Sequence, residues 1–196
     1  MKILHIIPSA FEYFDDIRAQ AFEFLEAENK LGIESDAITL EYGAVSRRKK
    51  FEAATIAPSR NYLGQESIEK NVQAWEYYDI VNLHAPFFGA GGKIINFLES
   101  NPDKVFLMTY HYDFKTTDFF SFFIKLYNYY YLPKLFKKAK KITFFANRRK
   151  ESRSGIDMVK NDSKVVVLGL FEESEDIHSD RIVQDLVMVY NNITLK

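Results

Sequence analysis

The sequence Val105-Phe-Leu-Met-Thr-Tyr-His111-Tyr-Asp113 is followed by an aromatic and lysine-rich segment from Phe119 to Lys141 and then by Ile142-Thr-Phe-Phe-Ala-Asn-Arg148. Unbroken apolar runs of this kind are typical of parallel strands that are buried on both faces. The segment between them has the pattern of a helix, so the order is strand, helix, strand. Polar residues just past such strands lie at the carboxyl edge of the sheet, where α/β proteins bind ligands.

The same alternation continues through the rest of the chain. Strands are expected at 3–7, 36–40, 80–83, 105–109, 142–145 and 164–169, and helices at 16–31, 67–75, 91–98, 119–141 and 181–193. This order predicts right-handed crossovers and an α/β fold, a single doubly wound, mostly parallel Rossmann-like sheet of six or seven strands with helices on both faces. Residues 43–66, which include Arg47-Arg-Lys-Lys50, are interpreted as a basic loop with room for a short strand.

Composition limits the classes of protein that fit. With 196 residues, 47% of them hydrophobic, the chain can bury the core of one domain. A formal net charge of -1 argues against a nucleic-acid binder. The lack of cysteine excludes disulfides, iron–sulfur clusters and thiolate zinc sites. The apolar start, Met1 to Pro8, is too short for a signal-peptide core, and no run reaches the roughly 20 apolar residues of a membrane span. We therefore expect a cytoplasmic protein, with peripheral attachment to a membrane left open.

The order of motifs resembles the amino-terminal domain of family-four, GT-B-type glycosyltransferases. The family's T-Y-H-x-D strand end corresponds to Thr109-Tyr-His111-Tyr-Asp113, and its D-I-V-H-x-H-x-P motif to Asp79-Ile-Val-Asn-Leu-His84-Ala-Pro86. Its V-x-x-L/P-G motif corresponds to the strand that ends at Gly169. The resemblance implies an acceptor-side domain over residues 1–170, with an acidic linker and a returning carboxyl-terminal helix of the same domain over 171–196.

Two histidines are the leading candidates for the site. In the resembling family the histidine that matches His111 lines the cleft and contacts the donor sugar or the reacting groups, which makes His111 the catalytic candidate. The alternative is a histidine that only bonds a neighbouring loop. His84 is a candidate substrate-binding residue, against a packing or turn role set by Pro86. Asp113 is also a candidate substrate-binding residue, and it could orient the His111 imidazole or cap the next helix. We expect His84 and His111 to open onto one concave surface, with Arg148 nearby.

The turn after the strand at 142–145 supplies further candidates for substrate binding, Arg148, Arg149 and Ser152. Arginine at a sheet's carboxyl edge can bind phosphate bidentately; the alternative is a solvated helix start. No metal site is expected, because two histidines at strand ends have no third ligand at a recognisable spacing. His5 lies inside the first strand and is interpreted as a core residue.

The segment from Phe119 to Lys141 could bind membranes through five lysines, Lys134, Lys137, Lys138, Lys140 and Lys141. Basic amphipathic helices that carry aromatic residues bind anionic lipid surfaces. Members of the resembling family use this helix to approach lipid-linked acceptors. The alternative is core packing with a solvated lysine end that the helix dipole favours.

The resemblance implies sugar transfer from a nucleotide-sugar to a glycan or lipid-linked acceptor. Two departures shape this expectation. The family usually has a glycine pair in its first loop, where this chain has Ser9 to Asp16, and the family's nucleotide-binding domain precedes the final helix, where only residues 170–180 stand here. We therefore expect an acceptor-binding domain that is weak or inactive alone, with a separately encoded donor-binding chain or a homodimer completing it. No cofactor is expected, and a nucleotide-sugar donor only with the partner. The alternative is a non-catalytic binding or scaffold module.

Overall fold

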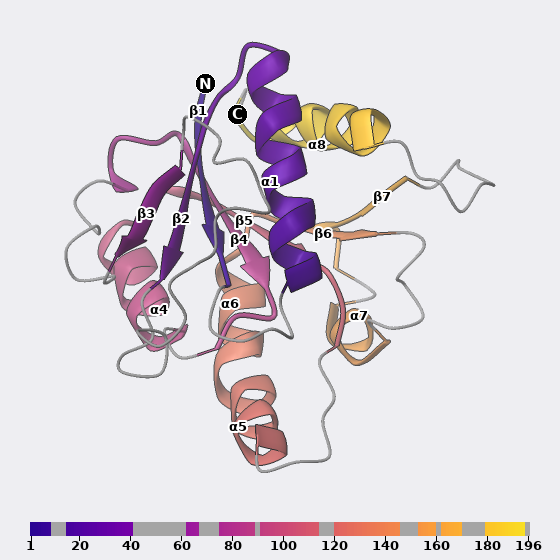
Figure 1. The fold of residues 1–196 in the computed structure, drawn as a ribbon. Helices are drawn as coiled ribbons and strands as arrows, with labels where there is room; N and C mark the ends of the chain where they lie inside the picture. Colours follow the sequence, from indigo (N-terminus) through magenta and orange to yellow (C-terminus); the bar gives the residue numbers. More distant parts are fainter. Residues whose placement is uncertain are drawn as a thin grey trace.

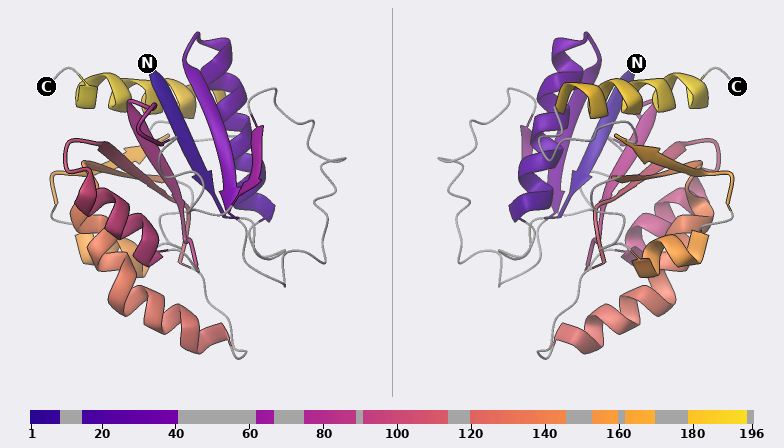
Figure 2. Two further views of the ribbon diagram at one scale, coloured as in Figure 1. Left: turned by 90° about the vertical axis from the view of Figure 1, so that its left-hand side faces the viewer. Right: turned by 90° about the vertical axis from the view of Figure 1, so that its right-hand side faces the viewer.

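The computed structural model describes residues 1–8, 15–40, 62–66, 75–88, 91–113, 120–145, 153–159, 162–169 and 179–194. The described residues form one seven-stranded, all-parallel sheet in the order β3-β2-β1-β4-β5-β6-β7 (Figures 1 and 2). The strands are β1 Lys2–Ile7, β2 Glu34–Leu40, β3 Tyr62–Glu66, β4 Ile80–Ala85, β5 Val105–Tyr110, β6 Lys141–Phe145 and β7 Val165–Leu168. The predicted fold class is confirmed, and β3 is the short strand for which the sequence left room.

Helices cover both faces of this sheet. They are α1 Asp15–Lys30, α4 Gly91–Ser100, α5 Phe120–Leu126, the π-helix η2 Tyr127–Tyr131, α6 Leu132–Lys138, α7 Arg153–Val159 and α8 Ser179–Thr194. The strand order reverses between β1 and β4, so right-handed crossovers place α1 on one face and α4 on the other. The α1 and α8 helices pack together on the first face, and α4 and α6 pack together on the second (Figure 1).

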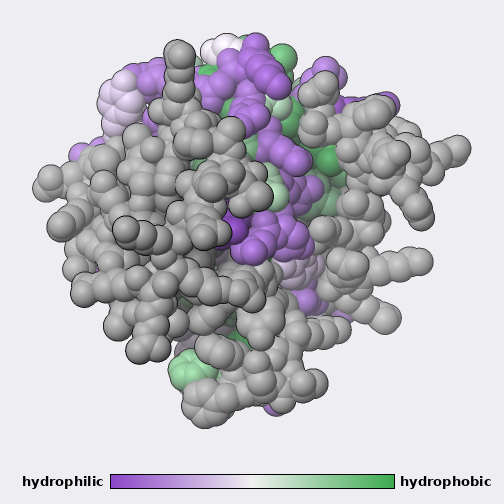
Figure 3. Space-filling model, in the orientation of Figure 1, coloured by the Kyte–Doolittle hydropathy of each residue, from purple (hydrophilic) through white to green (hydrophobic). Residues whose placement is uncertain are grey.

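The first helix is amphipathic, as its spacing predicts. Its buried residues include Ile17, Ala21 and Phe24, and its outward face is hydrophilic in Figure 3. It ends at Lys30, and Gly32, just beyond it, has a φ of 80°, a left-handed conformation that glycine adopts without strain. The backbone N–H of Ile33 donates to the carbonyl of Glu28 at 3.0 Å and closes the helix end. The expected helix end is confirmed.

The last helix, α8, docks on the domain as the apolar spacing predicts. Its buried residues include Ile182, Val183, Leu186 and Tyr190, which pack in one cluster with Phe24 of α1 and residues of the central strands. The returning helix therefore completes the layer that α1 begins.

The long segment after β5 differs from the single helix expected over 119–141. The described part is helical from Phe120, passes through the π-helical turn and stops at Lys138. Ala139 is extended, and the N–H of Lys140 donates to the carbonyl of Phe106 in β5 at 2.8 Å. Lys141 is the first residue of β6. The expectation that the helix reaches Lys141 is wrong, because bonding to β5 takes this stretch into the sheet.

Several expected features lie outside the described residues. They include most of the helix at 67–75, the basic run Arg47–Lys50 and the acidic linker before α8. Over the described ranges, no helix has both the length and the apolar character needed to cross a membrane.

Candidate functional site

The face of the sheet that α1 covers carries a row of buried polar side chains. Residues two apart in a strand point to the same face, so His5, the pair Asn82 and His84, and the pair Thr109 and His111 share one side with Thr143. The strand register sets His5 beside Asn82, His84 beside Thr109, and Thr109 beside Thr143. All six residues have 0% exposure, so each needs an internal hydrogen-bond partner.

Three of these residues are histidines that bond to one another in series. His5 Nε2 lies 2.8 Å from Glu28 Oε2, and His5 Nδ1 lies 2.9 Å from His84 Nε2. His84 Nδ1 lies 2.9 Å from His111 Nε2, and His111 Nδ1 lies 2.9 Å from Gln20 Oε1. We call these five residues the histidine chain. It crosses β1, β4 and β5 at the place where the strand order reverses, which is where open α/β sheets bind ligands.

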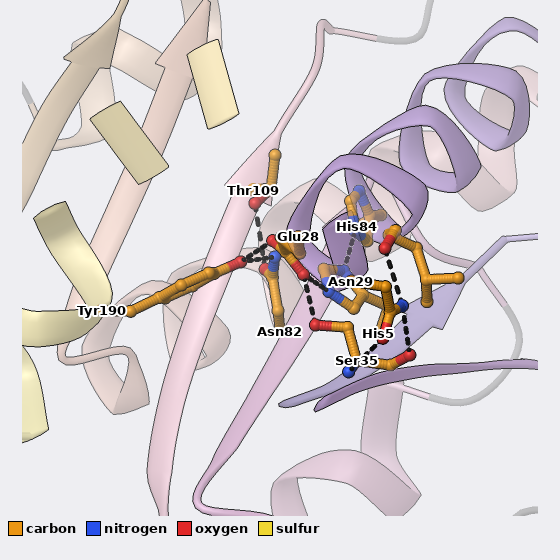
Figure 4. Close-up of polar contacts among 9 residues, drawn as sticks. His5, Glu28, Asn29, Ser35, Asn82, His84, Thr109 and Tyr190 are labelled. Atoms are coloured by element: carbon orange, nitrogen blue, oxygen red, sulfur yellow. Dashed lines mark hydrogen bonds and ion pairs between the residues drawn. The ribbon is translucent and has the colours of Figure 1, made fainter. Parts of the chain in front are cut away.

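Glu28 is the anionic end of the histidine chain. Three donors in the described part of the protein meet at its carboxylate: His5 Nε2, Ser35 Oγ at 2.6 Å and Tyr190 Oη at 2.8 Å (Figure 4). A protonated carboxyl group would have to donate one of its own hydrogens, so this arrangement fits the ionised form. The convergence also satisfies a charge that would be very costly to bury alone.

A second branch ties the carboxyl-terminal helix to the sheet. Asn82 Nδ2 donates to Tyr190 Oη at 3.4 Å, and Thr109 Oγ1 donates to Asn82 Oδ1 at 2.9 Å (Figure 4). Thr143 Oγ1 lies 3.1 Å from Thr109 Oγ1. The network therefore joins both helices on this face to the three strands β4, β5 and β6.

Burial fixes the protonation of two members of this network. Desolvation, with smaller contributions from His5 and His111, holds the pKa of His84 well below its usual value, so His84 is neutral. Desolvation, together with the charge of Glu28 and its hydrogen bond, raises the pKa of Tyr190 well above its usual value. Burial also raises the pKa of Tyr127.

These shifts predict a stability plateau between the two titrations. Unfolded histidine binds a proton below about pH 6.5 that buried His84 does not, so the free energy of unfolding should fall as pH drops, by up to about 1.4 kcal/mol per pH unit. Unfolded tyrosine loses its proton above about pH 10 while Tyr190 and Tyr127 keep theirs, so stability should also fall as pH rises past 10. Urea midpoints from pH 5 to 11 measure both limbs. A flat profile across this range would contradict the assignment.

The structure brings His84 and His111 together but does not open them to a surface. Both imidazoles are fully buried, so the expectation of a shared concave surface is wrong. His84 also lies inside β4 rather than beyond it. The reason is the cover that α1 and aromatic rings provide: the ring of Phe24 lies 6.4 Å from that of His84, and Phe145 lies 5.1 Å from His111. His5 is a core residue, as expected.

Gln20 is the member of the histidine chain that reaches the outer part of this edge. It is partly exposed on α1 and contacts His111 Nδ1 from the side opposite His84. A catalytic role for His111 stays a prediction.

Asp113 supports a helix later in the chain. Its Oδ1 accepts hydrogen bonds from Tyr110 Oη at 2.8 Å and from the backbone N–H of Gly155, in the first turn of α7, at 3.0 Å. A Cβ at Gly155 would lie 2.6 Å from Tyr110 Cε1, so only glycine fits there. Whether Asp113 caps the next helix in sequence stays a prediction, because residues 114–119 lie outside the described ones.

The other predicted site residues divide into two groups. Arg148, Arg149 and Ser152 lie outside the described residues, so their proximity to His111 stays a prediction. The five lysines are described. Lys134, Lys137, Lys138 and Lys140 are exposed, with Lys138 Nζ 3.7 Å from Glu99 Oε1, and half-buried Lys141 donates to the carbonyl of Ser163 at 3.0 Å.

Sequence reasoning missed Glu28, Gln20 and Tyr190 as site residues. A signal existed for Glu28, because it continues the apolar stripe of Ile17, Ala21, Phe24 and Leu25 along α1 and must therefore face the core. A charged residue at such a position needs a buried partner. Among the described residues, no group of three or more His, Cys, Asp or Glu side chains is arranged to hold a metal ion.

Comparisons with known proteins agree with the architecture. No protein-family model and no curated protein matches the sequence. Among solved structures, an alpha-glucosyltransferase in complex with UDP and a 13-mer DNA containing an HMU base matches with a TM-score of 0.55 and 12% identity, over 86% of this chain and 42% of that chain. The fold of this chain is therefore similar to that of part of this enzyme.

A second structure of an alpha-glucosyltransferase with UDP and such a DNA gives the same TM-score of 0.55 at 11% identity. The chain spans less than half the length of these enzymes, since the match covers 42% of each. At this level of identity the likeness concerns the fold alone.

Proposed function

We propose that this chain is the acceptor-side domain of a glycosyltransferase, taking part in sugar transfer from a nucleotide-sugar to a glycan or lipid-linked acceptor. The observation that carries the proposal is the position of the histidine chain in a glycosyltransferase-like fold. Its bonds run from β1 across the reversal of strand order to His111, just past the end of β5, and then to Gln20. Ligands of open α/β sheets bind outside the strand ends at this reversal.

The donor site belongs to a second component in this proposal. The amino-terminus of a helix beside β1 is the natural place for a diphosphate, because its free N–H groups attract anions. Here carboxylates occupy that place: Asp16 Oδ1 accepts the N–H of Ile17 at 2.8 Å and the hydroxyl of Tyr112 at 2.9 Å, and Asp15 pairs with Arg18 at 2.8 Å. Two acidic side chains repel a diphosphate. A separately encoded donor-binding chain, or a second copy of this chain, completes the cleft.

Calorimetric titration of the purified chain with nucleotide diphosphate sugars tests this division of roles. We expect a Kd above about 1 mM, which corresponds to a binding free energy weaker than about 4 kcal/mol. We also expect no turnover. The double variant Asp15→Asn, Asp16→Asn is the matched control. It should bind equally weakly if the donor site lies on another chain. Coexpression with a chain that carries a nucleotide-binding domain should restore transfer. Tight binding and turnover by the chain alone would refute the proposal.

A non-catalytic binding or scaffold module is the second candidate. The carboxylates at the start of α1 favour it, because they occupy a phosphate-binding position with protein groups. The two functions differ in one result: a scaffold gives no transfer even when the nucleotide-binding chain is present.

We also propose that the α5–η2–α6 segment attaches the protein to the surface of an anionic membrane. Its aromatic side chains are unusually exposed, with Phe122 at 63%, Phe123 at 48%, Tyr129 at 75% and Tyr130 at 52%. Figure 2 shows α5 projecting from the body of the domain. Aromatic residues and lysines together match the chemistry of the lipid interface, where rings insert among headgroups and ammonium groups meet lipid phosphates.

Vesicle sedimentation measures this attachment. Lysines close to an anionic surface contribute about 1 kcal/mol each, so binding should be clear with anionic vesicles at low salt and weak at high salt. The variant Lys134→Gln, Lys137→Gln should lose the salt-sensitive part, whereas Phe122→Ser, Tyr129→Ser should weaken binding at every salt concentration. The variant Lys30→Gln, on the distant α1, serves as the control for charge. Equal partitioning into neutral and anionic vesicles would contradict the electrostatic part.

A further inference from the structure

The bonds of the histidine chain have a fixed direction at its anionic end. Because the Glu28 carboxylate accepts, His5 Nε2 must carry the hydrogen that it donates. If His5 carries its only ring hydrogen on Nε2, its Nδ1 is an acceptor, and His84 Nε2–H then donates to it. His84 is neutral and therefore accepts at Nδ1, which leaves His111 Nε2 as the donor to His84. Each ring thus points its Nε2–H toward Glu28.

The far end of the chain imposes a second condition on His111. Its Nδ1 lies 2.9 Å from Gln20 Oε1, and an amide oxygen only accepts hydrogen bonds. With the Gln20 oxygen toward Nδ1, His111 carries hydrogens on both ring nitrogens and is a cation. The charges of the histidine chain then balance. Glu28 is a carboxylate, His111 is an imidazolium, and the two rings between them, His5 and His84, are neutral. If Gln20 turns its NH₂ toward Nδ1, His111 is neutral instead.

We propose that Glu28, His5 and His84 are positioning residues that fix the proton arrangement of His111, and that Gln20 selects its charge by presenting either its amide oxygen or its NH₂ group to Nδ1. The exchange moves one proton between water and His111 Nδ1 while the Gln20 amide rotates, and no other bond changes. In the cationic state the Nδ1–H points toward the carboxyl edge. A ligand oxygen that replaced Gln20, from a phosphate or a sugar hydroxyl, would accept that hydrogen bond.

The surroundings of His111 favour this two-state behaviour. Apolar contact with Phe145 at 5.1 Å between ring centroids keeps water from one side, and His84 contacts the ring from β4. Two carboxylates accept hydrogen bonds from the tyrosines on either side of His111 in the sequence: Asp16 on α1 accepts from the hydroxyl of Tyr112, and Asp113 accepts from that of Tyr110. The use of the proton in sugar transfer rests on the proposed function, whereas its position does not.

Long-range ¹H–¹⁵N spectra of the full chain, labelled at histidine, test the proton arrangement directly. The protein has four histidines, and three of them belong to the histidine chain. We expect His84 to show a single neutral tautomer with its hydrogen on Nε2 from pH 5.5 to 8. His111 should pass from the Nε2–H neutral form to the doubly protonated form as pH falls. Finding His84 with its hydrogen on Nδ1 would overturn the proposal.

Two variants test the coupling from opposite ends. Glu28→Gln removes the negative charge and should lower the titration midpoint of His111 by about one pH unit, with mixed tautomers at His84. The control, Tyr190→Phe, removes one hydrogen bond to the same carboxylate and keeps its charge, so the titration midpoint of His111 should stay in place.

If Glu28→Gln does not fold, Gln20→Leu tests the partly exposed end of the histidine chain, where loss of the acceptor should keep His111 neutral at pH 6. Equal midpoints in the native chain and in the folded variants would contradict the coupling. These spectra need no substrate, so a failure of sugar transfer leaves them unaffected.

Discussion

Replacing Glu28 with leucine is expected to lower the free energy of unfolding by about 4 kcal/mol, since removing one partner of a buried charged group typically costs 3–5 kcal/mol. The side chain is fully buried, and His5, Ser35 and Tyr190 all donate to it. Leucine fills a similar volume but accepts no hydrogen bond, so the hydrogens that His5, Ser35 and Tyr190 donate to Glu28 would lose that acceptor inside the core. Urea denaturation at pH 7.5 measures the change.

The matched control for this change lies on the same helix. Glu26 is exposed, so Glu26→Leu should alter stability by no more than about 0.5 kcal/mol. An effect of Glu28→Leu as small as that of Glu26→Leu would show that the buried network does not stabilise the fold.

Truncating Phe145 to alanine should cost about 4 kcal/mol and also disturb His111. The ring is buried between Phe24, at 5.7 Å, and His111, at 5.1 Å between centroids. Removing it loses burial energy and leaves a cavity, for which the typical cost is 3–5 kcal/mol. That cavity would adjoin the imidazole and could admit water, so the ¹⁵N signals of His111 should shift.

Phe144 provides the control, because it is equally buried but points to the opposite face of the sheet, where it packs on Tyr110 at 5.4 Å. Phe144→Ala should destabilise the protein by a similar amount and leave the His111 signals almost unchanged. Similar shifts in both variants would mean that His111 responds to general loosening of the core rather than to its neighbour.

Much of the fold could be predicted from the sequence, because its signals are local. Each buried strand is a short apolar run, and α1 and α8 each show helical spacing. The segment at 120–145 shows where such signals fail. Its sequence pattern predicts one continuous helix to Lys141, but the N–H of Lys140 donates to a carbonyl of β5. A hydrogen bond between segments this far apart cannot be predicted from the residues next to Lys140.

The site was predicted in part, for a related reason. The position of His84 and His111 near the strand ends follows from the strands themselves. Their burial does not, because it depends on α1 lying across them and on Phe24 and Phe145 packing against their rings. The role of Tyr190 could not be predicted from sequence patterns. Its hydroxyl donates to Glu28, which is 162 residues away, and nothing near either residue indicates the other as its partner.

That separation of 162 residues bears on when the domain can fold. During synthesis the chain leaves the ribosome from its amino-terminus, so α1 and Glu28 emerge long before α8 supplies the Tyr190 hydroxyl. Until then one carboxylate oxygen must be hydrated, and the apolar surface that α8 later covers is exposed. Contacts so distant in sequence slow folding, because a long loop must close before they form. Nascent chains arrested before residue 179 should therefore remain sensitive to protease, and resistance should arise only when the last helix has left the exit tunnel.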